Sequence, residues 1–354
     1  MTRDPDLLIG TYTSGHAALG VYLCALDAAH GIHVRAVGAA ADPSFLVRHP
    51  QLPLAYAVNE APRGHGGVSV LALDLPSARI AVLQQVDSGG EAPCHIAVAA
   101  DASGLVVAHY GCGTVRWLGL DEAGRCTGAS HVTRHELIEA DPSSHAGPRP
   151  RRQAAAHPHC VVIREAGIYV TDLGQDCIVR YRLDARHGLI ELDRCAIHAG
   201  AGPRHLCFAA DGNRAYVGNE LDNTVSTLAV GAGGRLTERS WCSSLPAGCT
   251  QRSAVGEVAL HPGGRWLYVS NRGFDSVAWY EVADGELQWA GCVPSQGGHP
   301  RHFAIAPDGT RLVAANRDAG NLVAWRIDPA SGALREPGVA SATVPAPVCI
   351  CWLT

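Results

Sequence analysis

Short runs of apolar residues recur along the chain, and each is followed by a turn, a second apolar run and a polar end. One copy opens at Pro203, continues through Leu206-Cys207-Phe208 and turns at Asp211-Gly212. Its second run, Ala215-Tyr216-Val217, leads to Asn219-Glu220. Apolar runs of this length, bounded by Gly, Asp and Pro, are typical of buried β-strands. The pattern therefore predicts an all-β chain.

This unit repeats along nearly the whole sequence. Copies open at Pro43, Pro93, Pro158 and Pro203, near Val255, and at Pro300 and Pro347. Six intervals separate the first copy from the last, so the period is about 50 residues. Strand-built repeats of about 40–50 residues are typical of β-propeller blades.

We expect four strands in each repeat, for example at residues 204–209, 214–219, 224–230 and 236–243. The turns between these segments contain Asp-Gly, Asp-Asn and Gly-Gly pairs, which tight hairpins favour. Third strands often alternate apolar and polar residues, as at 277–282. Four antiparallel strands make one blade. Seven copies predict a seven-bladed β-propeller that forms a single domain over residues 1–354.

The two ends of the chain complement each other. The last copy, at 347–352, contains only a first strand, whereas residues 7–13 and 20–27 supply a second and a third strand without a first. We therefore expect the C-terminal strand to pair with the N-terminal blade and close the ring. Closure removes an exposed strand edge, which would otherwise favour aggregation.

Composition and net charge argue against some classes of function. The net charge of −5 gives no general attraction to nucleic acid or to anionic membranes. Residues 1–6 contain no basic region followed by an apolar run, and no apolar run approaches the ~18 residues that span a bilayer. The 13 cysteines are scattered, without a Cys-x-x-Cys pair, and are typical of reduced core residues. We therefore expect a cytoplasmic protein.

One repeat is longer than the others. The excess lies at residues 131–156 and includes Arg149, Arg151 and Arg152. An insertion just before His157 could cover a site, and it could equally be a tolerated surface loop.

Blade geometry predicts where a site would lie. In antiparallel strands, the start of strand one and the end of strand two reach the same face, and strand one lies innermost in a propeller. Residues at these positions should converge on one mouth of the channel: His157, His159, Arg204, His205, Glu220, Arg272, Arg301 and His302.

These side chains are typical of a site that binds an anionic substrate and acts on it. Arginine binds carboxylate or phosphate through its forked donors, histidine acts as an acid or base near neutral pH, and a glutamate beside arginine stays ionised as a base or an orienter. His157 and His159 could hold zinc, but a third ligand is not evident, so we expect no metal and no cofactor. His205 and His302 follow Pro-Arg in two repeats and could be structural, as could Asp176 beside a turn.

The sequence resembles the lactonase family of seven-bladed propellers, to which propeller-type 6-phosphogluconolactonases belong and to which fungal muconate-lactonizing enzymes are related. The matching segments follow in order along the chain: 10–13, 147–148 with Arg152-Gln153, 157–159, 172–176, 202–205, 219–221, 267–273 and 300–301. Cys160 departs from the small polar residue expected after His159, and Arg149 and Arg151 enrich the loop.

By this resemblance, the active-site positions are His159, Arg204, Glu220 and Arg272. We expect the following residues to bind substrate: Arg152, Gln153, His157, Asp176, His205, Asn271 and Arg301. The implied reaction is hydrolysis of 6-phosphoglucono-1,5-lactone, with Glu220 or His159 as the base. The alternatives are cycloisomerisation of a muconate-type dicarboxylate and a non-catalytic scaffold propeller. The expected partner is a small anionic lactone, bound by a monomer or weak homodimer.

Overall fold

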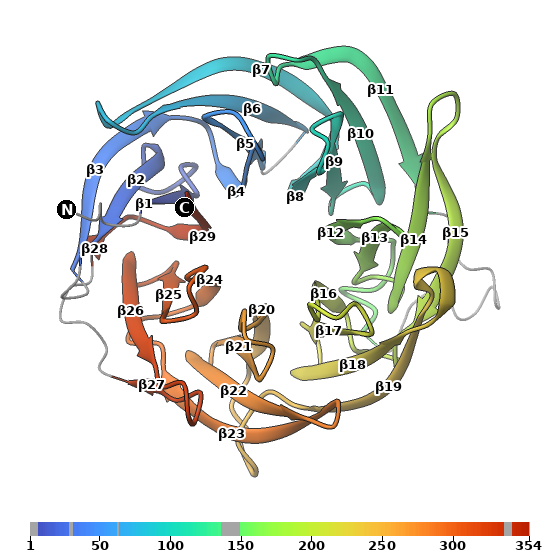
Figure 1. The fold of residues 1–354 in the computed structure, drawn as a ribbon, viewed down its shortest axis with the longest axis vertical. Coiled ribbons are helices and arrows are strands. Elements are labelled where there is room, and N and C mark those ends of the chain that lie inside the picture. Colours follow the sequence, from blue (N-terminus) through green and yellow to red (C-terminus); the bar gives the residue numbers. More distant parts are fainter. Residues whose placement is uncertain (1–5, 28–30, 62–63, 136–148, 336–341, 354) are drawn as a thin grey trace.

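The computed structural model describes residues 6–27, 31–61, 64–135, 149–335 and 342–353. These residues form seven antiparallel sheets arranged around a central axis (Figure 1). The fold is a seven-bladed β-propeller, as the repeat predicts. In the described ranges the only helix is the single 3-10 turn Ala232–Gly234, and none could span a membrane.

Each blade runs from an innermost strand at the channel to an outermost strand at the rim (Figure 1). Blade 1 contains β29 Pro347–Trp352, β1 Asp6–Thr11, β2 Gly20–Leu26 and β3 Ile32–Ala39. Blade 2 contains β4 Pro43–Arg48, β5 Leu54–Asn59, β6 His65–Asp74 and β7 Arg79–Glu91. Blade 3 contains β8 Pro93–Val98, β9 Gly104–His109, β10 Thr114–Leu120 and β11 Cys126–Arg134. Blade 4 contains β12 Pro158–Arg164, β13 Gly167–Asp172, β14 Cys177–Asp184 and β15 Gly188–Ala196.

The remaining blades complete the circle. Blade 5 contains β16 Pro203–Phe208, β17 Arg214–Asn219, β18 Thr224–Val230 and β19 Leu236–Ser243. Blade 6 contains β20 Ala254–Leu260, β21 Trp266–Arg272, β22 Ser276–Ala283 and β23 Glu286–Pro294. Blade 7 contains β24 Pro300–Ile305, β25 Arg311–Asn316, β26 Asn321–Ile327, β27 Leu334–Arg335 and the short β28 Ala342–Thr343, which also pairs with β26.

The ring closes as predicted. Strand β29 pairs antiparallel with β1, and Leu7 lies opposite Trp352. The first and last strands of the chain, β1 and β29, therefore lie in the same blade (Figure 1). Val348, Cys349 and Ile350 of β29 are buried.

Removing residues 347–354 is expected to destabilise the whole ring. The deletion exposes the edge of β1 and removes three buried apolar side chains, which together contribute about 5 kcal/mol or more. We expect a lower Tm and a less cooperative transition in calorimetry. A truncated protein that melts like the intact one would show that this closure does not hold the ring together.

The core lies between the blades. Strands β9 and β21 are buried along their whole length, because each sheet is covered on both faces by its neighbours. Apolar side chains of adjacent blades interlock, as where Tyr56 of β5 and Leu105 of β9 meet in one cluster. The alternation expected at 277–282 is largely lost, because β22 is buried on both faces over its first five residues. Regular alternation appears instead in the outermost strand β19.

First strands carry a bulge directly after their proline. In β12, β16 and β24 the register skips one residue: His159, Arg204 and Arg301. A bulged residue leaves the ladder and can be aimed in a different direction. In β20, which lacks the proline, the register skips both Gly256 and Glu257. The repeat itself thus releases one or two residues per blade from pairing at the channel.

Candidate active site

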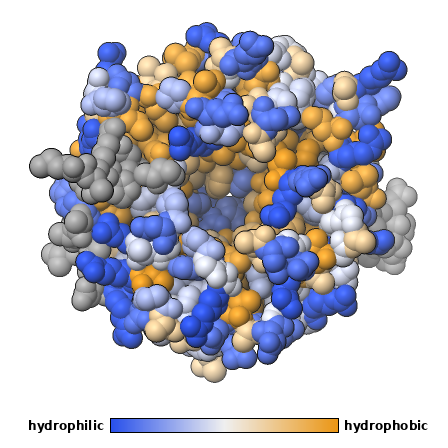
Figure 2. Space-filling view, in the orientation of Figure 1, coloured by the Kyte–Doolittle hydropathy of each residue, from blue (hydrophilic) through white to orange (hydrophobic). Residues whose placement is uncertain are grey.

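The centre of the ring is hollowed, and hydrophilic residues lie inside it (Figure 2). The starts of β12, β16 and β24 and the ends of β17 and β21 meet there, as blade geometry predicts (Figure 1). Two pockets of about 600 and 650 Å³ lie elsewhere, around residues 163–167, and contain no predicted site residue.

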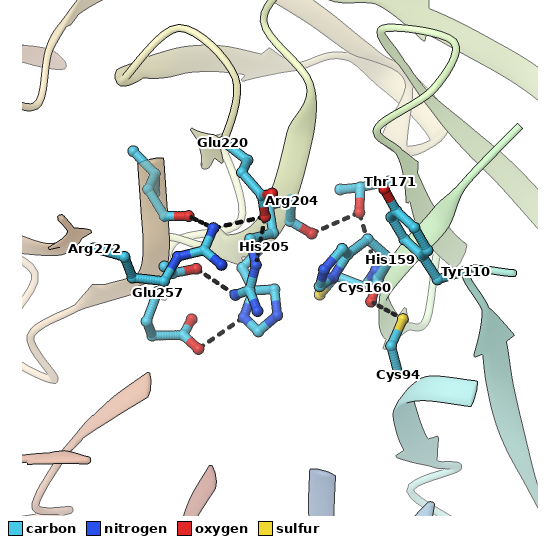
Figure 3. A network of polar contacts seen from close by, with 12 residues as sticks. Cys94, Tyr110, His159, Cys160, Thr171, Arg204, His205, Glu220, Glu257 and Arg272 are labelled. Atoms are coloured by element: carbon cyan, nitrogen blue, oxygen red, sulfur yellow. Dashed lines mark hydrogen bonds and ion pairs between the residues drawn. The ribbon is translucent and has the colours of Figure 1, made fainter. Parts of the chain in front are cut away.

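Glu220 follows β17 and forms ion pairs with three arginines of the site. Its Oε1 accepts a hydrogen bond from Arg152 Nη2 at 2.7 Å. Its Oε2 lies 2.7 Å from Arg272 Nη2 and 3.1 Å from Arg204 Nε (Figure 3). One carboxylate therefore pairs with three guanidinium groups, which come from the insertion and from two different blades, and the cluster keeps a net positive charge.

Backbone carbonyl groups fix the two buried arginines. Arg204 donates to the Gly256 carbonyl oxygen, and Arg272 donates to that of Val255. A Cβ at Gly256 would lie 2.7 Å from the carbonyl oxygen of Pro300, so only glycine permits this close approach. The Nε atoms of both arginines are buried and make no hydrogen bond within the described chain, although Arg204 Nε lies within ion-pair distance of Glu220. Such donors can serve a ligand.

Electrostatic interactions keep Glu220 and its arginine partners ionised. Burial alone would raise the pKa of Glu220, but Arg272, Arg204 and Arg152 hold it well below the usual value. Burial and the charges of Arg272 and Arg301 lower the pKa of Arg204 to about 10, which still leaves this side chain protonated at neutral pH. Because its oxygens already accept from arginines, Glu220 is a weak proton acceptor and a strong positioning group.

His159 faces the same hollow from β12. Burial and the nearby Arg204 and His205 hold the pKa of His159 well below the usual value, so the imidazole is neutral at pH 7. Its Nδ1 is buried without a hydrogen-bond partner in the described chain. A neutral imidazole keeps an unprotonated nitrogen that can accept a proton from water, and the cations that lower its pKa weaken it as a base.

Tyr110 joins the insertion to this wall of the site. Its hydroxyl accepts from Arg152 Nε and Nη2 at 3.2 and 3.0 Å. Its ring stacks on His157 at 4.3 Å and lies edge-on to His159 at 5.8 Å. His157 Nδ1 donates to the Tyr110 carbonyl oxygen at 2.7 Å. Arg152 is therefore held in place from two sides.

A second layer lies beneath the arginines. Glu257 Oε2 accepts from His205 Nδ1 at 2.7 Å and from His302 Nε2 at 3.1 Å. Because Nδ1 of His302 accepts from the Ile350 amide, its Nε2 carries the proton. Burial raises the pKa of Glu257 and lowers that of His302 to about 4. His205, predicted to bind substrate, thus faces Glu257, while its Nε2 has no partner in the described chain.

Arg301 occupies another part of the channel wall. Its guanidinium lies 5.3 Å from the centre of the Tyr12 ring, and the Tyr12 hydroxyl donates to Glu60 at 2.9 Å. Burial would lower the pKa of Arg301, but Tyr12 and Glu60 raise it above the usual value. Arg301 therefore adds a permanent positive charge to the mouth.

Three of the residues expected to bind substrate already have structural contacts. Gln153 donates to the Leu173 carbonyl oxygen, Asp176 accepts from the amides of Gly200 and Gly202, and Asn271 bonds to Ser244. Their role in binding stays a prediction, and support of the loops accounts for the contacts seen. Residues 136–148 of the insertion, with the Gly147-Pro148 match, lie outside the described residues.

Sequence reasoning missed Glu257, Tyr110 and Tyr12. Glu257 had a signal, because it is an acidic residue inside the apolar segment 255–260. Glu60, the partner of Tyr12, follows its second strand at the repeat position that Glu220 occupies in blade 5, so the sequence does indicate it. Tyr12 lies in the family-matching segment 10–13, whereas Tyr110 follows an apolar strand without any such signal.

Chelation is expected to leave activity unchanged. In the part of the chain that the structure describes, no three His, Cys, Asp or Glu side chains are placed to hold a metal ion. Initial rates before and after dialysis against EDTA test this expectation. Loss of turnover that a single divalent cation restores would contradict it.

Comparison with known proteins identifies the family to which the chain belongs. A family model described as "Lactonase, 7-bladed beta-propeller" matches residues 6–352. The chain belongs to this lactonase family, as the resemblance predicts. The 6-phosphogluconolactonase of Bacillus subtilis is 31% identical over 98% of this chain and 97% of its own length. That of Formosa agariphila is 27% identical over 93% of this chain and 94% of its own. The solved Pseudomonas aeruginosa periplasmic gluconolactonase PpgL superposes with a TM-score of 0.88 at 28% identity, over 99% of each chain.

Proposed function

We propose that this chain is a lactone hydrolase of the 6-phosphogluconolactonase type, which opens the ester ring of 6-phosphoglucono-1,5-lactone. One observation carries the proposal: Glu220 gathers three arginines beside a neutral, buried His159. Membership of the lactonase family and two full-length relatives named 6-phosphogluconolactonase support the same reaction.

The arrangement assigns a role to each group. His159 accepts a proton from water as the water oxygen attacks the lactone carbonyl carbon. The carbonyl oxygen becomes an oxyanion, which the cationic donors of Arg204 and Arg272 stabilise. The C–O ester bond then breaks, and the ring oxygen leaves as a hydroxyl after taking a proton from the imidazolium. Water and lactone give a sugar acid, which releases one proton at neutral pH.

Acid release on mixing the purified protein with 6-phosphoglucono-1,5-lactone tests the proposal directly. The rate must exceed the spontaneous hydrolysis of the lactone in the same buffer. Absence of any enzymatic rate with this lactone and with glucono-1,5-lactone would contradict the function.

The same assay separates the alternatives. A cycloisomerase would form a lactone from a muconate-type dicarboxylate, which a parallel absorbance assay would detect. A scaffold propeller would act on neither substrate. The gathering of buried arginine and histidine nitrogens that make no hydrogen bond within the described chain favours an enzyme over a scaffold.

We also propose that the protein acts in the cytoplasm as a monomer or weak homodimer. All 13 cysteines are free thiols, which supports a reducing compartment. Fractionation and gel filtration would test both points.

A further inference from the structure

A separate pocket of about 360 Å³ is lined in part by Glu220 and Arg152 of the candidate active site, whereas His159 is not among its lining residues. The insertion contributes Arg149 and Arg152 to its wall, and the connection from β19 to β20 contributes residues 251–254. Leu221, Asp222 and Asn223, which follow β17, complete the lining. The pocket therefore shares Glu220 and Arg152 with the site described above.

Two arginines of this pocket are uncommitted. Arg152 is engaged by Glu220 and Tyr110, whereas the guanidinium groups of Arg149 and Arg252 make no ion pair or hydrogen bond in the described part of the chain. Both side chains are exposed to solvent. Free arginines facing a hollow beside an active site are suited to bind a doubly charged anion through forked donors.

The two acidic residues in the wall, Glu220 and Asp222, do not cancel the charge of the arginines. Asp222 Oδ2 accepts from His198 Nε2 at 2.7 Å, and its Oδ1 accepts from the Thr224 hydroxyl at 2.8 Å. Burial alone would lower the pKa of His198, but hydrogen bonds to the carboxylates of Glu238 and Asp222 raise it above the usual value. His198 thus engages the Asp222 carboxylate, and the pocket lining keeps an excess of positive charge because it contains three arginines against two carboxylates.

Arg152 belongs to two groups of residues with different chemistry. Through Glu220 it is linked to Arg204 and Arg272, the buried arginines of the candidate active site. It also lines the pocket together with Arg149 and Arg252, and the pocket lining contains no histidine. A substrate with its ester at one end and a phosphate at the other would span the two.

We propose that this pocket is the phosphate-binding subsite, in which Arg149 and Arg252 clamp the phosphate monoester of the lactone. The inference rests on the proposed lactone hydrolysis, because that reaction fixes where the carbonyl binds. It makes Arg149 and Arg252 the residues that discriminate phosphorylated from unphosphorylated lactones.

Two lactones test the subsite. The double variant Arg149→Ala/Arg252→Ala is compared with the native protein on 6-phosphoglucono-1,5-lactone and on glucono-1,5-lactone. We expect the ratio of kcat/KM for the two lactones to fall by roughly tenfold or more, chiefly through KM for the phosphorylated lactone. Arg151→Ala is the matched control: Arg151 is exposed on the same loop but does not line the pocket, and the ratio should stay within about twofold of native. An unchanged ratio in the double variant would overturn the proposal.

Phosphate binding provides a readout that does not depend on turnover. Inorganic phosphate should inhibit the native protein competitively, and titration calorimetry should show that its affinity falls at least tenfold in the double variant but not in Arg151→Ala. Equal affinity in all three proteins would overturn the subsite even if lactone hydrolysis is confirmed. Conversely, phosphate binding that depends on Arg149 and Arg252 without any lactone hydrolysis would sustain an anion site and contradict the proposed function.

Discussion

Replacing Glu220 with glutamine is expected to lower lactone hydrolysis by about 10²-fold or more and to destabilise the fold. The carboxylate holds Arg204 and Arg272 by contacts of 3.1 and 2.7 Å, and these donors must be placed to within a fraction of an ångström to stabilise an oxyanion. Glutamine keeps the shape of the side chain but leaves buried guanidinium charges without their counter-ion. Breaking a buried ion pair in this way costs about 3 kcal/mol or more.

The stability effect has a defined pH dependence. Because the pKa of Glu220 is depressed in the folded protein, its contribution is complete above the ordinary glutamate value of 4.5 and is lost as the pH falls through the folded value. The difference in unfolding free energy between native and Glu220→Gln proteins should therefore be largest at neutral pH and shrink in acid. Chemical denaturation at pH 7 and at pH 3 measures it.

An exposed glutamate provides the control. Glu281 pairs with Arg265 at 2.9 Å, and both side chains are at least 36% exposed, so Glu281→Gln should change stability by less than about 1 kcal/mol and spare turnover. Native activity in Glu220→Gln would remove Glu220 from the mechanism and leave His159 as the candidate base. Lost stability with native turnover would make the arginine cluster purely structural.

Replacing His159 with asparagine is expected to reduce kcat by about 10²- to 10⁴-fold, the usual loss when a general base is removed. Asparagine is polar and similar in size to part of the ring, but it does not accept a proton from water. Since Nδ1 of His159 has no partner in the described chain, the fold should lose little stability. Single-turnover kinetics and a thermal melt separate the two effects.

The pH profile of the native protein tests the same role. Burial, with Arg204 and His205 nearby, lowers the pKa of His159, so its basic form persists below the ordinary value of 6.5. The acid limb of kcat/KM should therefore lie below pH 6.5 and should disappear in His159→Asn. His187, whose side chain is 71% exposed, provides the control in His187→Asn. Unchanged kcat in His159→Asn would leave Glu220 as the base.

The sequence alone determined the architecture, because a propeller repeats one local solution. Apolar runs, tight turns and a period of about 50 residues define each blade without reference to distant contacts. Strand β19 at Leu236–Ser243 and the closing strand β29 at Pro347–Trp352 agree with the predicted ranges. The family motifs also named His159, Arg204, Glu220 and Arg272, which the structure brings to one mouth.

Only the tertiary structure decided how these groups share their charges. Arg152 is 68 residues from Glu220 in sequence, and nothing in its loop predicts that it reaches blade 5. The link between His205 and Glu257 likewise joins two blades, and it depends on the bulge that frees Glu257 from the ladder of β20.

The pocket of Arg149 and Arg252 shows the same limit. Its wall combines an insertion and a blade connection about 100 residues apart, which only the packing of neighbouring blades brings together. The local pattern of apolar and polar residues determines where each strand lies in the sequence, because backbone pairing occurs within one blade. Distances between side chains of different blades depend on how the whole ring packs and on where each bulge directs its residue, so they emerge only from the folded molecule.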